Sequence, residues 1–110
     1  MNIITINEQP LKETPRGVQG RPLVDSPDVH LMNLVLAPSQ KVPSHATPVD
    51  VLFHIIDGRG TITIGEETRQ VSTGQIVISP AHVPHALEAD LDSPFEVLVY
   101  KTPNPKAKKQ

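Results

Sequence analysis

The fold is decided by the stretch from Ser39 to Ala89, which reads SQKVPSHATPVDVLFHIIDGRGTITIGEETRQVSTGQIVISPAHVPHALEA. Short runs rich in Val, Ile and Thr alternate in it with Pro and Gly, and such runs are typical of β-strands. Asp57-Gly58 and Ser72-Thr73-Gly74 are typical of the turns that join strands. The stretch therefore predicts an all-β structure built from short strands.

The rest of the chain continues this pattern, because its twelve prolines and six glycines are spread along the sequence and leave little room for long helices. Many short strands at regular spacing indicate a β-sandwich or a β-barrel. We expect strands over residues 2–6, 18–24, 29–36, 51–57, 60–65, 68–71, 75–79, 84–89 and 95–101.

A chain of 110 residues has room for one domain. We expect an N-terminal arm over residues 1–28, with edge strands that pack on the barrel or on a partner subunit. The barrel itself is expected over residues 29–101. The last segment, residues 102–110, is rich in Lys and Pro and is expected to be a basic, disordered tail.

Charge and composition exclude several classes of function. The formal net charge is −2, but four of the ten basic residues lie in the last ten positions, so the rest of the chain carries about −6. An acidic body argues against a nucleic-acid partner. No apolar run approaches the roughly 18 residues that a membrane span needs, and the first ten residues do not resemble a signal peptide. Without cysteines there is no disulfide framework or thiolate site, and we expect a cytoplasmic protein.

The expected strand over residues 51–57 carries apolar side chains on both faces. Val51, Phe53 and Ile55 lie on one face, whereas His54 lies on the other between Leu52 and Ile56. A strand of this kind is covered on both sides. The barrel interior would cover the first face, and the N-terminal arm or a partner subunit would cover the second, so we expect a homodimer.

The stretch from Ser39 to Ala89 resembles the two sequence motifs of the cupin superfamily. The first motif, G-x5-H-x-H-x3,4-E-x6-G, falls on Ser39, His45, Thr47, Val51 and Gly58. The second motif, G-x5-P-x-G-x2-H-x3-N, falls on Gly74, Pro80, His82, His85 and Ala89. This resemblance implies a cupin-type double-stranded β-helix, that is, a jelly-roll barrel.

The resemblance also implies a metal site inside the barrel, because cupins use two His and one Glu of the first motif and the His of the second to bind a divalent metal. Here it assigns two ligands, His45 and His85, while Thr47 and Val51 stand where the other His and the Glu belong. Imidazole suits metals such as Zn, Fe or Ni, but a durable site needs a third donor. Asp50 or His54 could supply it if a late strand start or a bulge turned either side chain inward.

Two functions of different classes follow. The first is a metal-dependent enzyme, such as an oxygenase or isomerase, that acts on a small organic molecule through metal chemistry at His45 and His85 with Zn, Fe, Ni or Mn. The second is a metal-free module that binds or senses a small molecule, with Thr47 and the two histidines as hydrogen-bonding groups. Either ligand would lie against a mostly apolar pocket wall, which we expect to consist of Val51, Phe53, Ile55, Ile76, Ile78 and Leu87.

Overall fold

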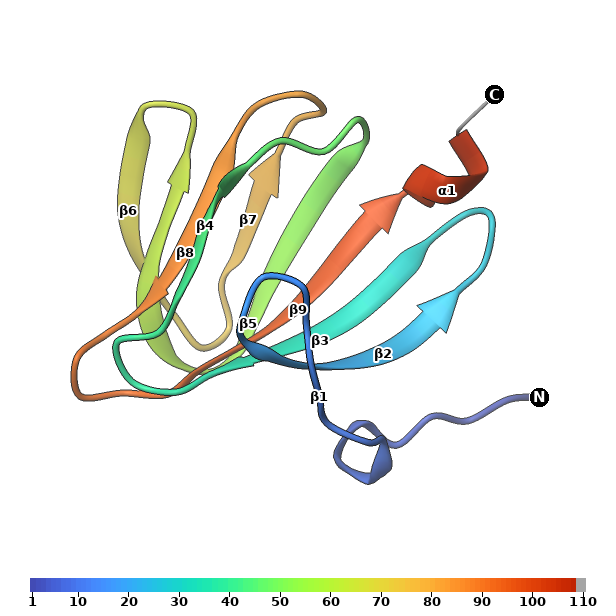
Figure 1. Ribbon diagram of the computed structural model, residues 1–110, viewed down its shortest axis with the longest axis horizontal. Helices are drawn as coiled ribbons and strands as arrows, with labels where there is room; N and C mark the ends of the chain where they lie inside the picture. Colours follow the sequence, from blue (N-terminus) through green and yellow to red (C-terminus); the bar gives the residue numbers. More distant parts are fainter. Residues whose placement is uncertain (109–110) are drawn as a thin grey trace.

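Nine strands form one curled sheet in the computed structural model, which describes residues 1–108 (Figure 1). The sheet order is β1-β2-β3-β9-β5-β8-β4, and β6 and β7 both pair with β5. The all-β prediction is therefore confirmed. The elements are η1 (Ile6–Glu8), β1 (Lys12–Glu13), β2 (Gln19–Asp25), β3 (His30–Leu36), β4 (Lys41–His45), β5 (Asp50–Ile64), β6 (Glu67–Ser72), β7 (Ile76–Ser79), β8 (His85–Ala89), β9 (Phe95–Thr102) and α1 (Pro105–Lys108).

The long strand β5 joins the two halves of the barrel. Its first half pairs with β7 and β9, and its second half pairs with β6 and β8. The sequence predicted a turn at Asp57-Gly58 between two strands, and this prediction is wrong. The register shifts between Ile55 and Asp57, and Gly58 has a φ of 82°. This irregularity bends one continuous strand instead of reversing the chain.

Two other strand predictions differ from the structure. Residues 2–6 form no strand; the chain is irregular up to Thr5 and then enters η1, and Ile3 is exposed. Strand β4 was not predicted, because its sequence is mostly polar and contains Pro43. A proline is tolerated there since β4 is an edge strand, and Pro43 lies within the register shift between Val42 and His45.

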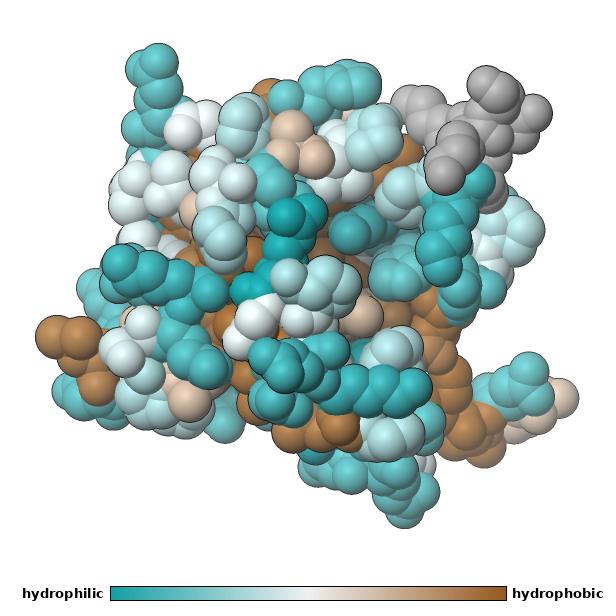
Figure 2. Space-filling model, viewed as in Figure 1, coloured by the Kyte–Doolittle hydropathy of each residue, from teal (hydrophilic) through white to brown (hydrophobic). Residues whose placement is uncertain are grey.

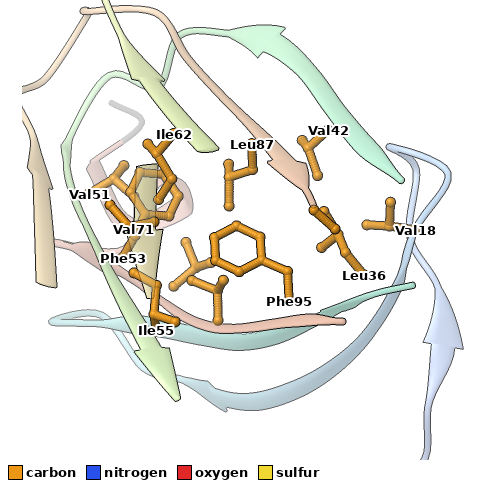
Figure 3. Close-up of a cluster of buried hydrophobic side chains, with 13 residues drawn as sticks. Val18, Leu36, Val42, Val51, Phe53, Ile55, Ile62, Val71, Leu87 and Phe95 are labelled. Atoms are coloured by element: carbon orange, nitrogen blue, oxygen red, sulfur yellow. The ribbon is translucent and has the colours of Figure 1, made fainter. Parts of the chain in front are cut away.

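The hydrophobic core fills the space between the two halves of the curled sheet (Figure 3). Phe53, Ile55 and Phe95 are among its largest fully buried side chains. Burying a side chain of this size contributes about 1.5–3 kcal/mol to folding. The buried members of the cluster are Val18, Leu36, Val42, Val51, Phe53, Ile55, Ile62, Val71, Leu87, Ala89, Phe95, Val97 and Val99.

Strand β7 presents the opposite face from the one that we expected. Ile76 and Ile78 are 61% and 68% exposed, so they lie outside the barrel and form no part of its pocket. The register explains this, because Val77 is paired with the buried Phe53 and directly paired residues share a face of the sheet. The side chains of β7 that face the interior are therefore Val77 and Ser79.

The start of the C-terminal tail is held against the loop between β2 and β3, whereas we expected a disordered end from residue 102 onward. Asn104 is only 3% exposed, and its Nδ2 donates to Asp25 Oδ1 at 2.6 Å and to the Ser26 carbonyl at 3.0 Å. Lys106 forms an ion pair with Asp25 at 3.4 Å. These contacts lower the pKa of Asp25, the Asn104 hydrogen bond having the largest effect. Residues 109–110 lie outside the described part of the chain.

The outer face around β5 and β7 is where we predict contact with a second copy of the chain. Ile76 pairs across the ladder with His54, and Ile78 pairs with Leu52. We expect the wild type to run at about twice the monomer mass of 12.0 kDa in light scattering, and the double variant Ile76→Lys/Ile78→Lys to run as a monomer. Leu91→Lys, in the exposed β8–β9 loop, is the control and should leave the mass unchanged. A wild type of monomer mass would contradict the prediction.

Of the helices that the described residues form, none is long and apolar enough to cross a lipid bilayer.

Candidate functional site

A pocket of about 290 Å³ opens at one end of the barrel, between the β1–β2 loop and the inner faces of β3, β4, β5, β8 and β9. The β1–β2 loop lies in front of the barrel strands in Figure 1. In the same view, Figure 2 shows brown apolar atoms in the gaps between hydrophilic side chains. The lining consists of Thr14, Pro15, Arg16, His30, Met32, Leu34, Val42, His45, Phe53, His85, Leu87, Val99 and Lys101.

His45 and His85 meet in this pocket. They are paired across β4 and β8, and their ring centroids are 4.6 Å apart with an angle of 76° between the ring planes. Phe53 also packs against His85, at 5.2 Å between ring centroids. Ser79 Oγ lies 3.2 Å from His85 Nδ1, and His45 Nδ1 lies 3.2 Å from the Pro43 carbonyl oxygen. Because a carbonyl only accepts, His45 Nδ1 carries the proton in that bond and leaves Nε2 as the free acceptor of the neutral ring.

Both histidines are neutral near pH 7. Burial lowers the pKa of His85 from 6.5 to about 4, and the charges of Lys101, of Arg16 and of His45 when it is protonated act in the same direction. Burial also lowers the pKa of His45, although the hydrogen bond to Pro43 opposes that shift. The pair therefore offers neutral imidazoles to whatever enters the pocket.

Asp50 and His54 do not join this pair. Both belong to the parity of β5 that points away from the interior, since Val51, Phe53 and Ile55 are all buried on the inner face. Asp50 Oδ1 instead accepts a hydrogen bond from the Ala81 N–H at 2.9 Å. The prediction that one of them turns inward is wrong because the strand starts regularly at Asp50 and its irregularity comes only after Ile55.

The expected pocket wall is only partly present in the structure. Phe53 and Leu87 line the pocket, whereas Val51 and Ile55 are buried in the core and do not reach it. Thr47 is buried but also does not line the pocket, and its carbonyl accepts from the His82 N–H at 2.8 Å. Ile76 and Ile78 lie outside the barrel, as described above.

Three basic residues of the lining were not predicted as site residues: Arg16, His30 and Lys101. Lys101 follows Phe95, Val97 and Val99 on the inner parity of β9, so strand alternation could have found it. His30 is paired with Lys101 across β3 and β9. Arg16 lies on the β1–β2 loop, and no pattern in the sequence indicates that this loop reaches the pocket. Burial, and then the charge of Arg16, lowers the pKa of Lys101.

The residues present do not fit the metal that the cupin motifs imply. Of the four ligand positions, Thr47 and Val51 carry side chains that bind no such metal and that do not line the pocket. Within residues 1–108 no group of three or more His, Cys, Asp or Glu side chains could hold a metal ion. The remaining two imidazoles share their pocket with Lys101 and Arg16, whose positive charges repel a dication.

Comparisons with known proteins agree with this fold. The model of the family described as Cupin domain matches residues 32–100. The chain is 37% identical to the protein SCO3923 of Streptomyces coelicolor over 54 residues, which cover 49% of this chain and 50% of that one. It therefore spans about half the length of this curated relative.

Solved structures extend the likeness over most of the chain. The conserved protein SPY1581 from Streptococcus pyogenes, of unknown function, is 30% identical with a TM-score of 0.69, over 81% of this chain and 76% of that one. The polyketide cyclase RemF from Streptomyces resistomycificus is 15% identical with a TM-score of 0.84, over 93% of this chain and 79% of that one. The second likeness concerns the fold alone.

Proposed function

This chain belongs to the cupin domain family, and from that premise we propose that its barrel binds a small organic molecule without a resident metal ion. The observation that carries the proposal is the pocket around His45 and His85. It can hold a small molecule, but it retains only two of the four side chains that the cupin motifs use to bind a metal.

The pocket has the composition of a small-molecule site. Most of its wall is apolar, and a few polar groups lie among the apolar side chains. Such a combination holds the body of a ligand by burial and orients it by hydrogen bonds. The free Nε2 of His45 is available as an acceptor for a donor group of the ligand. The apolar wall consists of Met32, Leu34, Val42, Phe53, Leu87 and Val99.

The metal-dependent oxygenase or isomerase that the sequence also allowed is the less favoured function. It needs a third donor, and Asp50 and His54, the two candidates for it, lie outside the pocket. Metal analysis of untagged protein separates the two functions. Stoichiometric Zn, Fe, Ni or Mn that is lost in both His45→Ala and His85→Ala would contradict metal-free binding and support the metal-dependent enzyme.

We predict that EDTA-treated protein binds benzamide, a small neutral probe with an apolar body. With nine non-hydrogen atoms, we expect a Kd on the order of 1 mM. Methyl NMR titration would show shifts for the pocket residues Leu87 and Val99. Met32→Phe should block binding because Met32 lines the pocket.

The matched control for this titration is Val35→Phe. Val35 lies on the same strand, β3, but on the opposite parity from Met32, so the added ring falls outside the barrel. Binding should survive in this variant. No shifts in the wild type, or equal loss in both variants, would contradict the proposed pocket.

A further inference from the structure

We infer that the ligand of this pocket is a small organic monocarboxylate, whose carboxylate meets Arg16 and Lys101 while its apolar body lies against the barrel wall. The inference rests on the proposed function, because it names the chemical class of ligand for the same pocket. The observation behind the inference is that the charged side chains around the pocket are all basic. A ligand without charge would not explain this distribution.

None of the described residues that line the pocket is acidic, although the chain has twelve Asp and Glu residues. Its ionisable members are Arg16, Lys101 and three histidines. In the described part of the chain, Lys41, Arg59, Arg69 and Lys106 form ion pairs with acidic residues, whereas Arg16 and Lys101 form none. The two full positive charges of the pocket therefore have no ion-pair partner among residues 1–108.

In the protein without a ligand, the charged form of Lys101 is energetically disfavoured. Its side chain has the inner parity of β9 and lines the pocket, so its ammonium group is partly removed from water. Arg16 adds a second positive charge that further opposes protonation of Lys101. A bound anion would compensate both effects, since an opposite charge nearby favours the charged form of an amine.

The supply of hydrogen-bond donors favours a carboxylate over a phosphate. The pKa values of His30, His45 and His85 are all lowered, so Arg16 and Lys101 are the fixed charges of the lining near pH 7. The rest of the wall is mostly apolar and offers few donors for the many oxygens of a phosphate. A guanidinium and an ammonium can donate to the two oxygens of one carboxylate, and the apolar wall suits an apolar body attached to it.

The test compares benzoate with benzamide, which has the same shape without the charge, in calorimetric titrations at low salt. We expect the wild type to bind benzoate at least ten-fold more tightly than benzamide. This preference should fall to three-fold or less in Lys101→Met and in Arg16→Gln. Lys41→Met is the control, since Lys41 is exposed on β4 and lines no part of this pocket.

The outcomes separate this inference from the proposed function. Equal binding of benzoate and benzamide would overturn the carboxylate and leave the pocket in place. Binding of neither probe would overturn both. A preference for benzoate that persists in both variants would overturn the assignment to Arg16 and Lys101. Because Arg16 is exposed, its replacement does not threaten the fold. Tighter binding of inorganic phosphate than of benzoate would overturn the class of anion.

Discussion

Replacing Gly58 by alanine is expected to lower the free energy of unfolding by about 2–5 kcal/mol. Gly58 has a φ of 82°, which costs an L-residue roughly 1–2 kcal/mol. A Cβ at this position would also overlap the Pro94 carbonyl oxygen and approach Ser93 Oγ at 3.1 Å. Overpacking of this kind typically costs a further 1–3 kcal/mol, and here the obstacle is backbone, which cannot rotate away. Urea unfolding monitored by circular dichroism measures the loss.

Gly74→Ala is the matched control for Gly58→Ala. Gly74 has a similar φ of 92°, but apart from its two chain neighbours no described residue has an atom within 4 Å of the added Cβ. We expect a loss of only about 1–2 kcal/mol, which is the backbone penalty alone. Equal losses in the two variants would mean that the close approach of Pro94 to β5 has no energetic role.

Acidification from pH 6.5 to pH 4 is expected to remove about 3 kcal/mol of stability through His85 alone. Its pKa is about 4 in the folded protein and 6.5 when unperturbed, and each pKa unit corresponds to about 1.4 kcal/mol. Between these values the unfolded state binds the proton and the folded state does not, so the free energy of unfolding falls as the pH falls. This contribution is fully present above pH 6.5.

His85→Gln should reduce the slope of stability against pH in this window. The slope should not vanish, because burial also lowers the pKa of His30 and His45. Asp25 does not interfere, since its lowered pKa makes its contribution decline only below about pH 3.8. His82→Asn, at an exposed loop position with a φ of 70°, is the control. Urea unfolding at several pH values measures the slope, and an unchanged slope in His85→Gln would contradict the prediction.

The sequence could predict which face of β5 points inward, although both of its faces carry apolar side chains. Val51, Phe53 and Ile55 were assigned to one face, and all three are buried. The inward face of β7 could not be predicted, because Ile76, Val77 and Ile78 are all apolar and show no alternation of apolar and polar residues. Only the pairing of Val77 with Phe53 decides that Ile76 and Ile78 point outward.

The candidate site could also be predicted only in part. The motif spacing brought His45 and His85 to one pocket, as the geometry has them. Asp50 and His54 failed as third donors because their direction depends on where the irregularity in β5 falls, and one residue of register reverses it. Arg16 reaches the pocket through a tertiary contact of a loop, for which a single sequence holds no periodic signal.

The position of β5 in the pairing scheme also has a consequence for how the chain folds. This strand pairs with β6, β7, β8 and β9, and every one of these partners follows it in the sequence. The pairing of Asp50 with Thr102 closes a loop that contains nearly half of the chain. Contacts of such long range are slow to form, with folding times of milliseconds to seconds in barrels of this kind. On the ribosome, the barrel could close only after β9 has emerged.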